Sequence, residues 1–198
     1  DVSYVQVHNG SDDGIEWFGG TVGIKNFVVT GASDDSLDWT DGWRGFAQYG
    51  VVVQTLFPVT DGSRSKDNTI EADNLGSDMD RLPRSNPQIA NLTIVSDDGQ
   101  AILLREGTGL GLYNSVIADD SGESTCLDID NVTTADFNGD GTVGEGHDYV
   151  GSLFACATAA DAGTGEDDVS GADTLALMEA NSTVSENGDS LDGYINGS

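Results

Sequence analysis

The sequence predicts an all-β fold, a parallel β-helix (solenoid) in which short strands stack as successive turns of the chain. The first observation is a repeat: residues Ser11–Gly20 return as a similar pattern at Ser33–Gly42, and each matched pair lies 22 residues apart. The second is a strand-like alternation of apolar and acidic side chains inside both copies. A fixed offset of this size is typical of repeat architectures, whose units stack on one another.

Each repeat contains a short strand with one apolar face. Ile15-Glu16-Trp17 and Leu37-Asp38-Trp39 place two apolar side chains on one face and a carboxylate on the other, as in a half-buried strand. A second apolar run follows each copy, at 26–29 and at 49–53. A coil of this length cannot bury its apolar face alone, so it must stack on a neighbouring coil.

The same pattern continues with altered spacing to residue 130. Ile70 lies 33 residues after Leu37, and we assign the 11 residues beyond one period to an outer loop at Pro58–Asn68. We expect about five coils over residues 1–130, with strands stacking in parallel. Their apolar residues should then lie above one another in a single column: Ile15, Leu37, Ile70, Ile102 and Leu127.

Five runs between residues 3 and 130 carry a family resemblance: Tyr4–Asn9 with Asp12–Val22, Asp38-Trp39 with Gly42-Trp43, Ile70–Asn74, Pro83–Pro87, and Leu104–Thr108. They resemble a family of bacterial exported or surface lipoproteins with a pectin-lyase-like, right-handed parallel β-helix. The resemblance implies a right-handed coil and an extracellular or outer-surface location. It also implies a longer parent protein, and it implies no particular reaction.

The charge limits the range of partners. The chain carries 35 acidic and 7 basic residues, a formal net charge of −28. Such a surface repels nucleic acid and anionic lipid, and divalent cations are its natural small partners. No stretch approaches the roughly 20 apolar residues of a transmembrane helix.

Residues 131–157 are expected to form an insertion, bracketed by Cys126 and Cys156. Their separation of 30 residues permits a disulfide worth roughly 3 kcal/mol, which an extracellular setting would preserve. The alternative is two buried free thiols.

The insertion contains a calcium-loop pattern that resembles the first two-thirds of an EF-hand or dockerin loop. Oxygen-bearing residues alternate from Asp136, and Gly141 permits the sharp turn. The twelfth position is His147, so Glu145 or Asp148 would have to close the site. The predicted calcium ligands are Asp136, Asn138, Asp140, Thr142, Glu145 and Asp148. The alternative is an Asx-rich turn that satisfies its own backbone.

Acidic corners precede several strands, at Asp12-Asp13, Asp34-Asp35 and Asp97-Asp98. In stacked coils some of these carboxylates would lie roughly 5 Å apart. They either hold cations between them or accept hydrogen bonds from corner amides, and the second interpretation is favoured.

An enzyme of the polysaccharide lyase or glycoside hydrolase type is the alternative function. The chain lacks the Gly-His-Gly motif of such enzymes, and its histidines are His8 and His147. Arg81, Arg84 and Arg105 are the nearest approach to a basic cluster, and pairing with surface carboxylates explains them better. Trp17 and Trp39 should stack inside the column, which leaves Trp43 as an exposed contact for sugar rings.

Residues 158–198 are expected to form an acidic C-terminal segment with a short helix near 171–181, capped by Asp173. Together these features predict a non-catalytic extracellular or cell-surface scaffold or binding protein, calcium-stabilised and part of a larger protein or assembly. Polysaccharide, another surface protein, or further copies added by coil stacking are its expected partners.

Overall fold

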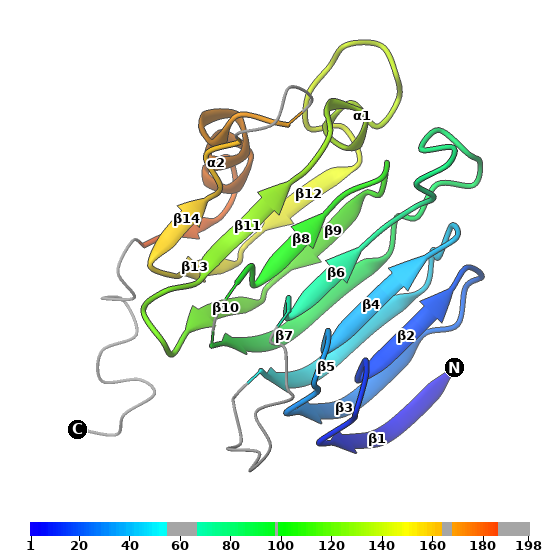
Figure 1. The fold of residues 1–198 in the computed structure, drawn as a ribbon, viewed down its shortest axis with the longest axis vertical. Coiled ribbons are helices and arrows are strands. Elements are labelled where there is room, and N and C mark those ends of the chain that lie inside the picture. The colour runs from blue at the N-terminus through cyan, green and yellow to red at the C-terminus, as the bar shows by residue number, and fades with distance from the viewer. Residues whose placement is uncertain (55–66, 98, 164–167, 186–198) are drawn as a thin grey trace.

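The computed structural model describes residues 1–54, 67–97, 99–163 and 168–185. It shows a parallel β-helix whose coils stack in chain order from the amino-terminal strands to helix α2 (Figure 1). Two sheets form its walls. One has six strands in the order β14-β11-β8-β6-β4-β2, and the other has nine strands, with β1-β3-β5-β7-β10-β13-β15 as its main path. Every strand pairing between the named strands is parallel.

The strands of both sheets are short, as the sequence predicts. The six-stranded sheet contains β2 (Ile15–Phe18), β4 (Leu37–Thr40), β6 (Ile70–Ala72), β8 (Ile102–Leu104), β11 (Thr125–Ile129) and β14 (Thr158–Ala160). The nine-stranded sheet contains β1 (Val2–His8), β3 (Ile24–Thr30), β5 (Phe46–Val53), β7 (Gln88–Ser96), β9 (Leu110–Tyr113), β10 (Val116–Asp119), β12 (His147–Val150), β13 (Leu153–Ala155) and β15 (Thr183–Val184). Two helices complete the described chain, α1 (Val132–Ala135) and α2 (Gly171–Glu179).

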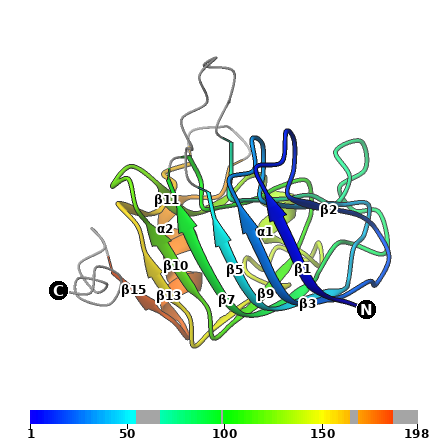
Figure 2. The ribbon, with the colours of Figure 1, turned by 90° about the horizontal axis from the view of Figure 1, so that it is seen from below.

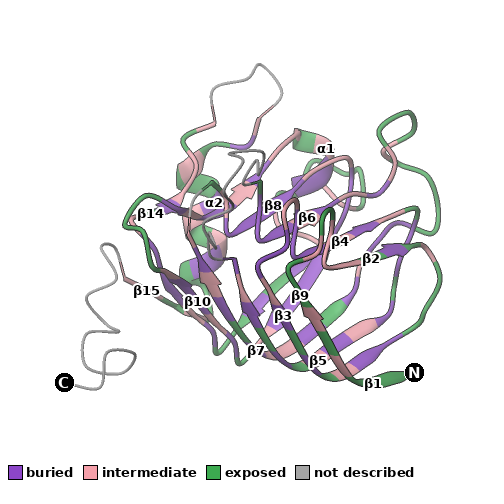
Figure 3. Cartoon of the chain, turned by 60° about the horizontal axis from the view of Figure 1, so that its bottom comes forward, coloured by how far each residue is buried: buried purple, intermediate pink, exposed green. Residues whose placement is uncertain are grey.

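The predicted apolar column is confirmed. Ile15 pairs with Leu37, Leu37 with Ile70, and Ile70 with Ile102 in the strand register. Leu127 occupies the same position in β11, because Asp128 pairs with Leu103. The last four of these side chains are fully buried, and buried residues recur along the strands of both sheets (Figure 3).

The coils continue beyond residue 130. Strand β12 pairs with β9, β13 with β10, and β14 with β11, which adds a sixth coil to the five that were expected. Within the expected insertion 131–157, residues 131–146 leave the column and residues 147–155 return to it as β12 and β13, so the excursion is shorter than expected. Cys126 and Cys156 lie on adjacent coils and form a disulfide, with their Cα atoms 5.4 Å apart. The expected outer loop at Pro58–Asn68 falls mostly outside the described residues.

A sharp bend recurs in every coil of the nine-stranded sheet. Tyr4, Asn26, Tyr49, Asn91 and Asn114 all have φ between 48° and 60°, and Gly151 has φ of 65°. The register places these residues above one another. Asparagine tolerates this left-handed conformation best among non-glycine residues. Asn114 also donates from Nδ2 to Asn91 Oδ1 at 2.5 Å, which ties the bends of these two coils together.

Helix α2 lies at the carboxyl end of the column, against β14, β11, β12 and β15 (Figures 1 and 2). Its side chains Thr174 and Met178 are buried there. The expectation that Asp173 caps this helix is wrong. Ser170 is the N-cap, accepting from the Asp173 backbone N–H, while its hydroxyl donates to the Asp173 carboxylate at 2.7 Å. No helix in the described ranges is both long enough and apolar enough to cross a membrane.

The tryptophans differ from expectation at one position. Trp17 and Trp39 are buried in register inside the column, as predicted. Trp43 is fully buried as well, stacked on Trp17 with ring centroids 4.2 Å apart, and it donates to the Val22 carbonyl at 2.9 Å. It is therefore not the exposed aromatic platform that was expected, because its ring packs against Trp17 and Trp39 inside the column.

Candidate functional site

The outer face of the six-stranded sheet carries stacked carboxylates. Side chains alternate along a strand, so the residues between buried positions face outward. Register places Glu16 beside Asp38 and Asp38 beside Glu71, on three successive coils. Leu103 occupies the next position, followed by Asp128 on β11. We call this set the acidic face: Glu16, Asp38, Glu71 and Asp128, with the corner residues Asp12, Asp13, Asp34 and Asp35.

The corner carboxylates tie one coil to the next. Asp13 Oδ1 accepts from the Asp35 backbone N–H at 3.2 Å, and Asp35 Oδ1 accepts from the Asn68 backbone N–H at 2.8 Å. This is the capping role that the sequence favoured for the acidic corners, and it is confirmed for these two residues. Asp98 lies outside the described residues.

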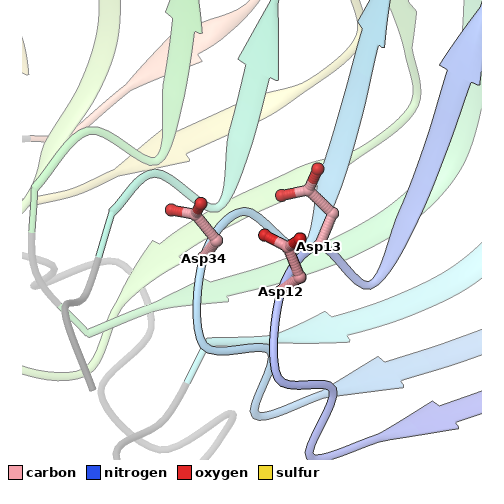
Figure 4. Close-up of side chains that lie close together, drawn as sticks. All are labelled: Asp12, Asp13 and Asp34. Carbon is pink, nitrogen blue, oxygen red and sulfur yellow. The ribbon is translucent and has the colours of Figure 1, made fainter. Parts of the chain in front are cut away.

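The same corners bring carboxylates close enough to share a cation. Asp12, Asp13 and Asp34 each offer an oxygen, and these oxygens all lie within 4.8 Å of one another (Figure 4). Asp13, Glu16 and Asp38 form a second group of the same kind. Calcium prefers carboxylate oxygens from several residues, and a flexible shell of six to eight ligands can be completed by water.

Burial raises the pKa values of these carboxyl groups. It lifts the pKa of Asp38 to about 8, helped by the nearby carboxylates of Asp13 and Glu16. The pKa of Asp13 rises to about 6, with burial again the largest cause. Burial and a hydrogen bond with Glu71 raise the pKa of Asp35 to about 9. Asp35 and Asp38 therefore resist ionisation at neutral pH unless a positive charge joins them, whereas Asp13 is mostly ionised there.

Arg105 neutralises part of the acidic face. Its guanidinium pairs with Glu71, and its Nε lies 2.8 Å from Asp73 Oδ1. Pairing with surface carboxylates was the expected role of Arg105, and it is confirmed. The carboxylate groups of the first two coils have no such partner among the residues that the structure describes.

The calcium-loop residues are only partly gathered. Asp136 accepts at its two oxygens from the backbone N–H groups of Asp140, at 3.0 Å, and of Gly141, at 2.9 Å. Asp140 accepts from the Thr142 N–H, and the Asn138 amide donates to Glu145. Five predicted ligands thus lie in one compact loop, in which carboxylates satisfy the backbone as the Asx-turn alternative expects.

Asp148 does not join that loop. It lies on β12 on the outside of the nine-stranded sheet, where the Tyr113 hydroxyl donates to it at 3.4 Å. His147, at the position where the motif usually closes, is buried, with Nε2 2.9 Å from the Thr134 carbonyl. Burial lowers the pKa of His147, which favours its neutral form. Strand pairing with β9 separates these two residues from the loop, so Glu145 is the only acidic closing candidate that remains near it.

Sequence reasoning did not single out Glu16, Asp38 and Glu71 as a site. Glu16 and Asp38 were noted only as the polar residues of alternating strands, and Glu71 only as part of the run Ile70–Asn74. The signal was nevertheless present, because a carboxylate stands between two core residues in each of the first three repeats. Stacking these repeats in register places the carboxylates side by side.

These features define a class: a parallel β-helix whose six-stranded sheet has an acidic outer face. A family model described as a pectate-lyase-like β-helix domain matches residues 1–196, and the chain belongs to this family. No curated protein and no solved structure matches the chain.

Proposed function

We propose that this chain is a non-catalytic scaffold or binding domain of an exported bacterial surface protein, and that its acidic face holds calcium. The observation that carries the proposal is the pair of carboxylate groups on the first two coils, each with oxygens within 4.8 Å. Ionised carboxylates at this spacing repel one another, and a divalent cation removes that repulsion while linking successive coils.

The extracellular location is part of the proposal. The disulfide between Cys126 and Cys156 supports it, because such bonds persist mainly outside the reducing cytosol. Calcium sites of extracellular modules are weak, with dissociation constants of roughly 0.1 to 1 mM, and open carboxylate groups at a surface suit that range. The proposal also includes attachment of the protein to the cell surface through a lipid anchor. Its partners would be a polysaccharide, another surface protein, or further copies of the chain that stack coil on coil.

Thermal unfolding tests the calcium site. Calcium at about 5 mM should raise the melting temperature by roughly 3 °C or more relative to chelator, because binding to the folded state alone stabilises it. Sodium chloride at matched ionic strength should give a smaller rise, since it only screens charge.

Two pairs of substitutions locate the effect. Asp13→Asn with Asp38→Asn should remove most of the calcium response if the acidic face binds, whereas Asp136→Asn with Asp140→Asn should remove it if the loop binds. Glu123→Gln, at an exposed loop residue, is the control for loss of one charge. An equal melting temperature in calcium and in chelator would contradict calcium binding at either place.

A polysaccharide lyase or hydrolase is a second candidate function, and one observation favours it. Asp38, with a pKa of about 8, stands beside other carboxylates, while Arg105 lies further along the same face. A protonated acid next to an ionised base is the arrangement of glycosidases. Release of unsaturated or reducing ends from uronic-acid polymers, abolished by Asp38→Asn, would favour this function over the scaffold.

A further inference from the structure

A pocket of about 420 Å³ lies where the chain leaves the six-stranded sheet, and its charge is opposite to that of the molecule. Arg44 and Arg84 line it, together with Leu82, Pro83, Asn86 and Phe137. None of the described lining residues is acidic, although acids outnumber basic residues by 35 to 7 in the whole chain. Arg81 lines an adjoining pocket of about 430 Å³ that shares Leu82 and Pro83.

The two arginines differ in what they offer a ligand. Arg84 is 5 % exposed and held in place: one guanidinium nitrogen donates to the Thr133 carbonyl at 3.0 Å, and another pairs with Asp80. Its guanidinium carbon also lies 5.1 Å from the centre of the Phe137 ring. Arg44 is exposed and forms no ion pair with the described residues. Arg44 therefore supplies the uncompensated charge.

Asn86 supplies a second polar group. Its oxygen Oδ1 is buried and has no hydrogen-bond partner. Such an atom is costly in a folded protein, and it calls for a donor. The Asn86 side chain lines the pocket, where a hydroxyl donor of a ligand would satisfy this oxygen.

The remaining walls are apolar. The Phe137 ring and the exposed Leu82 side chain, with Pro83, can cover the carbon chain of a small molecule. A ligand that fits all three features carries one anionic group for Arg44, a hydroxyl donor for Asn86, and a short carbon skeleton between them.

We propose that this pocket binds a small hydroxycarboxylate anion. A guanidinium recognises a carboxylate with two parallel hydrogen bonds, which a single neutral donor cannot replace. This site is separate from the acidic face, which attracts cations, so the inference goes beyond the proposed function and does not depend on it.

Isothermal titration with D-gluconate in about 150 mM sodium chloride tests the proposal, at an ionic strength that screens weak surface attraction. We expect a dissociation constant of roughly 0.1 to 1 mM, modest because the pocket is open. Glucitol, which has the hydroxyl groups without the charge, and acetate, which has the charge without the hydroxyl groups, should each bind at least about tenfold more weakly.

Substitutions assign the binding to this pocket. Arg44→Gln should weaken gluconate binding about tenfold or more, because it removes the charge-assisted hydrogen bonds. Asn86→Asp keeps the shape but adds a repelling charge, and it should abolish binding. Lys25→Gln, which removes one positive charge away from the pocket, should leave the affinity within about twofold. Arg84→Gln is not used, because it would also break the contact with Thr133.

Three results would overturn the proposal. Gluconate that fails to bind at about 10 mM, well above the expected dissociation constant, would overturn it. So would equal binding of glucitol, or unchanged affinity in Arg44→Gln when its melting temperature matches that of the parent chain.

Discussion

Asp38 shows at the scale of one residue how stacking changes chemistry. Nothing in the sequence distinguishes its carboxyl group from those of other aspartates. In the folded chain it lies between Glu16 and Glu71, where it is partly buried among like charges. Burial is the larger cause of its raised pKa, and the neighbouring carboxylates add to it. The folded protein therefore retains a proton on Asp38 at a pH where the unfolded chain has released it.

This difference predicts a pH dependence of stability without divalent cations. Because the pKa of Asp38 rises from 3.8 to about 8 on folding, the stability that its bound proton supplies is fully present below pH 3.8 and is lost progressively as the pH rises to about 8. The melting temperature should thus fall between pH 5 and 8.5. Asp38→Asn should flatten this fall and raise the melting temperature at pH 8 by roughly 2 to 5 °C, after allowing for solvent screening.

Differential scanning calorimetry in chelator at several pH values measures this effect. Glu123→Gln is the matched control, because it removes an exposed carboxylate from a loop and should leave the slope unchanged. A slope in Asp38→Asn as steep as that of the parent chain would show that Asp38 ionises freely in the folded state.

At the scale of elements, the bend column shapes each coil of the nine-stranded sheet. Positive φ at Asn91 and Asn114 turns the chain between two straight strand segments, and in the fifth coil these segments appear as separate strands, β9 and β10. A β-branched residue is strained in this conformation, whereas glycine adopts it freely.

Substitutions at Asn91 test the bend. Asn91→Val should destabilise the protein by about 1 to 3 kcal/mol, because valine is strained at φ of 56° and the hydrogen bond from Asn114 is lost. Asn91→Gly loses the same hydrogen bond but keeps the backbone, so it should cost about 1 kcal/mol or less. Urea denaturation measures both. Equal losses in the two variants would show that the side-chain bond, and not the backbone, sets the cost.

At the scale of the whole molecule, the disulfide joins the fifth coil to the sixth. Cys126 lies on β11 and Cys156 follows β13, so the bond closes the chain around residues 131–146, which leave the column. Helix α2 covers the end of the column beyond it. The last coil and this helix should therefore unfold together with the preceding coils.

Removal of the disulfide tests that coupling. Cys126→Ala with Cys156→Ala should lower the free energy of unfolding by about 3 kcal/mol, as expected for a closed loop of 30 residues. The melting temperature should fall by roughly 6 to 12 °C. The parent chain measured in reductant should approach the same value. A loss below about 1 kcal/mol would mean that the sixth coil is held by packing alone.

Much of the fold could be predicted from the sequence because its determinants are local. The 22-residue offset and the alternation around Trp17 and Trp39 predict strands, their parallel register and the buried column. The sixth coil was harder to foresee, since β12 contains His147 and Asp148 in place of a clear apolar pattern. Pairing of β12 with β9 places that segment in the column.

The sequence by itself therefore determined the repeating strand, its buried face and the excess of negative charge. Tertiary structure alone decided which charges meet: Asp38 and Glu71 are neighbours only because one coil lies on the next. It also buried Trp43 against Trp17 and brought Arg44 beside Arg84 in one pocket. Alternation is a property of consecutive residues, whereas burial, pKa and pocket chemistry depend on what neighbouring coils cover.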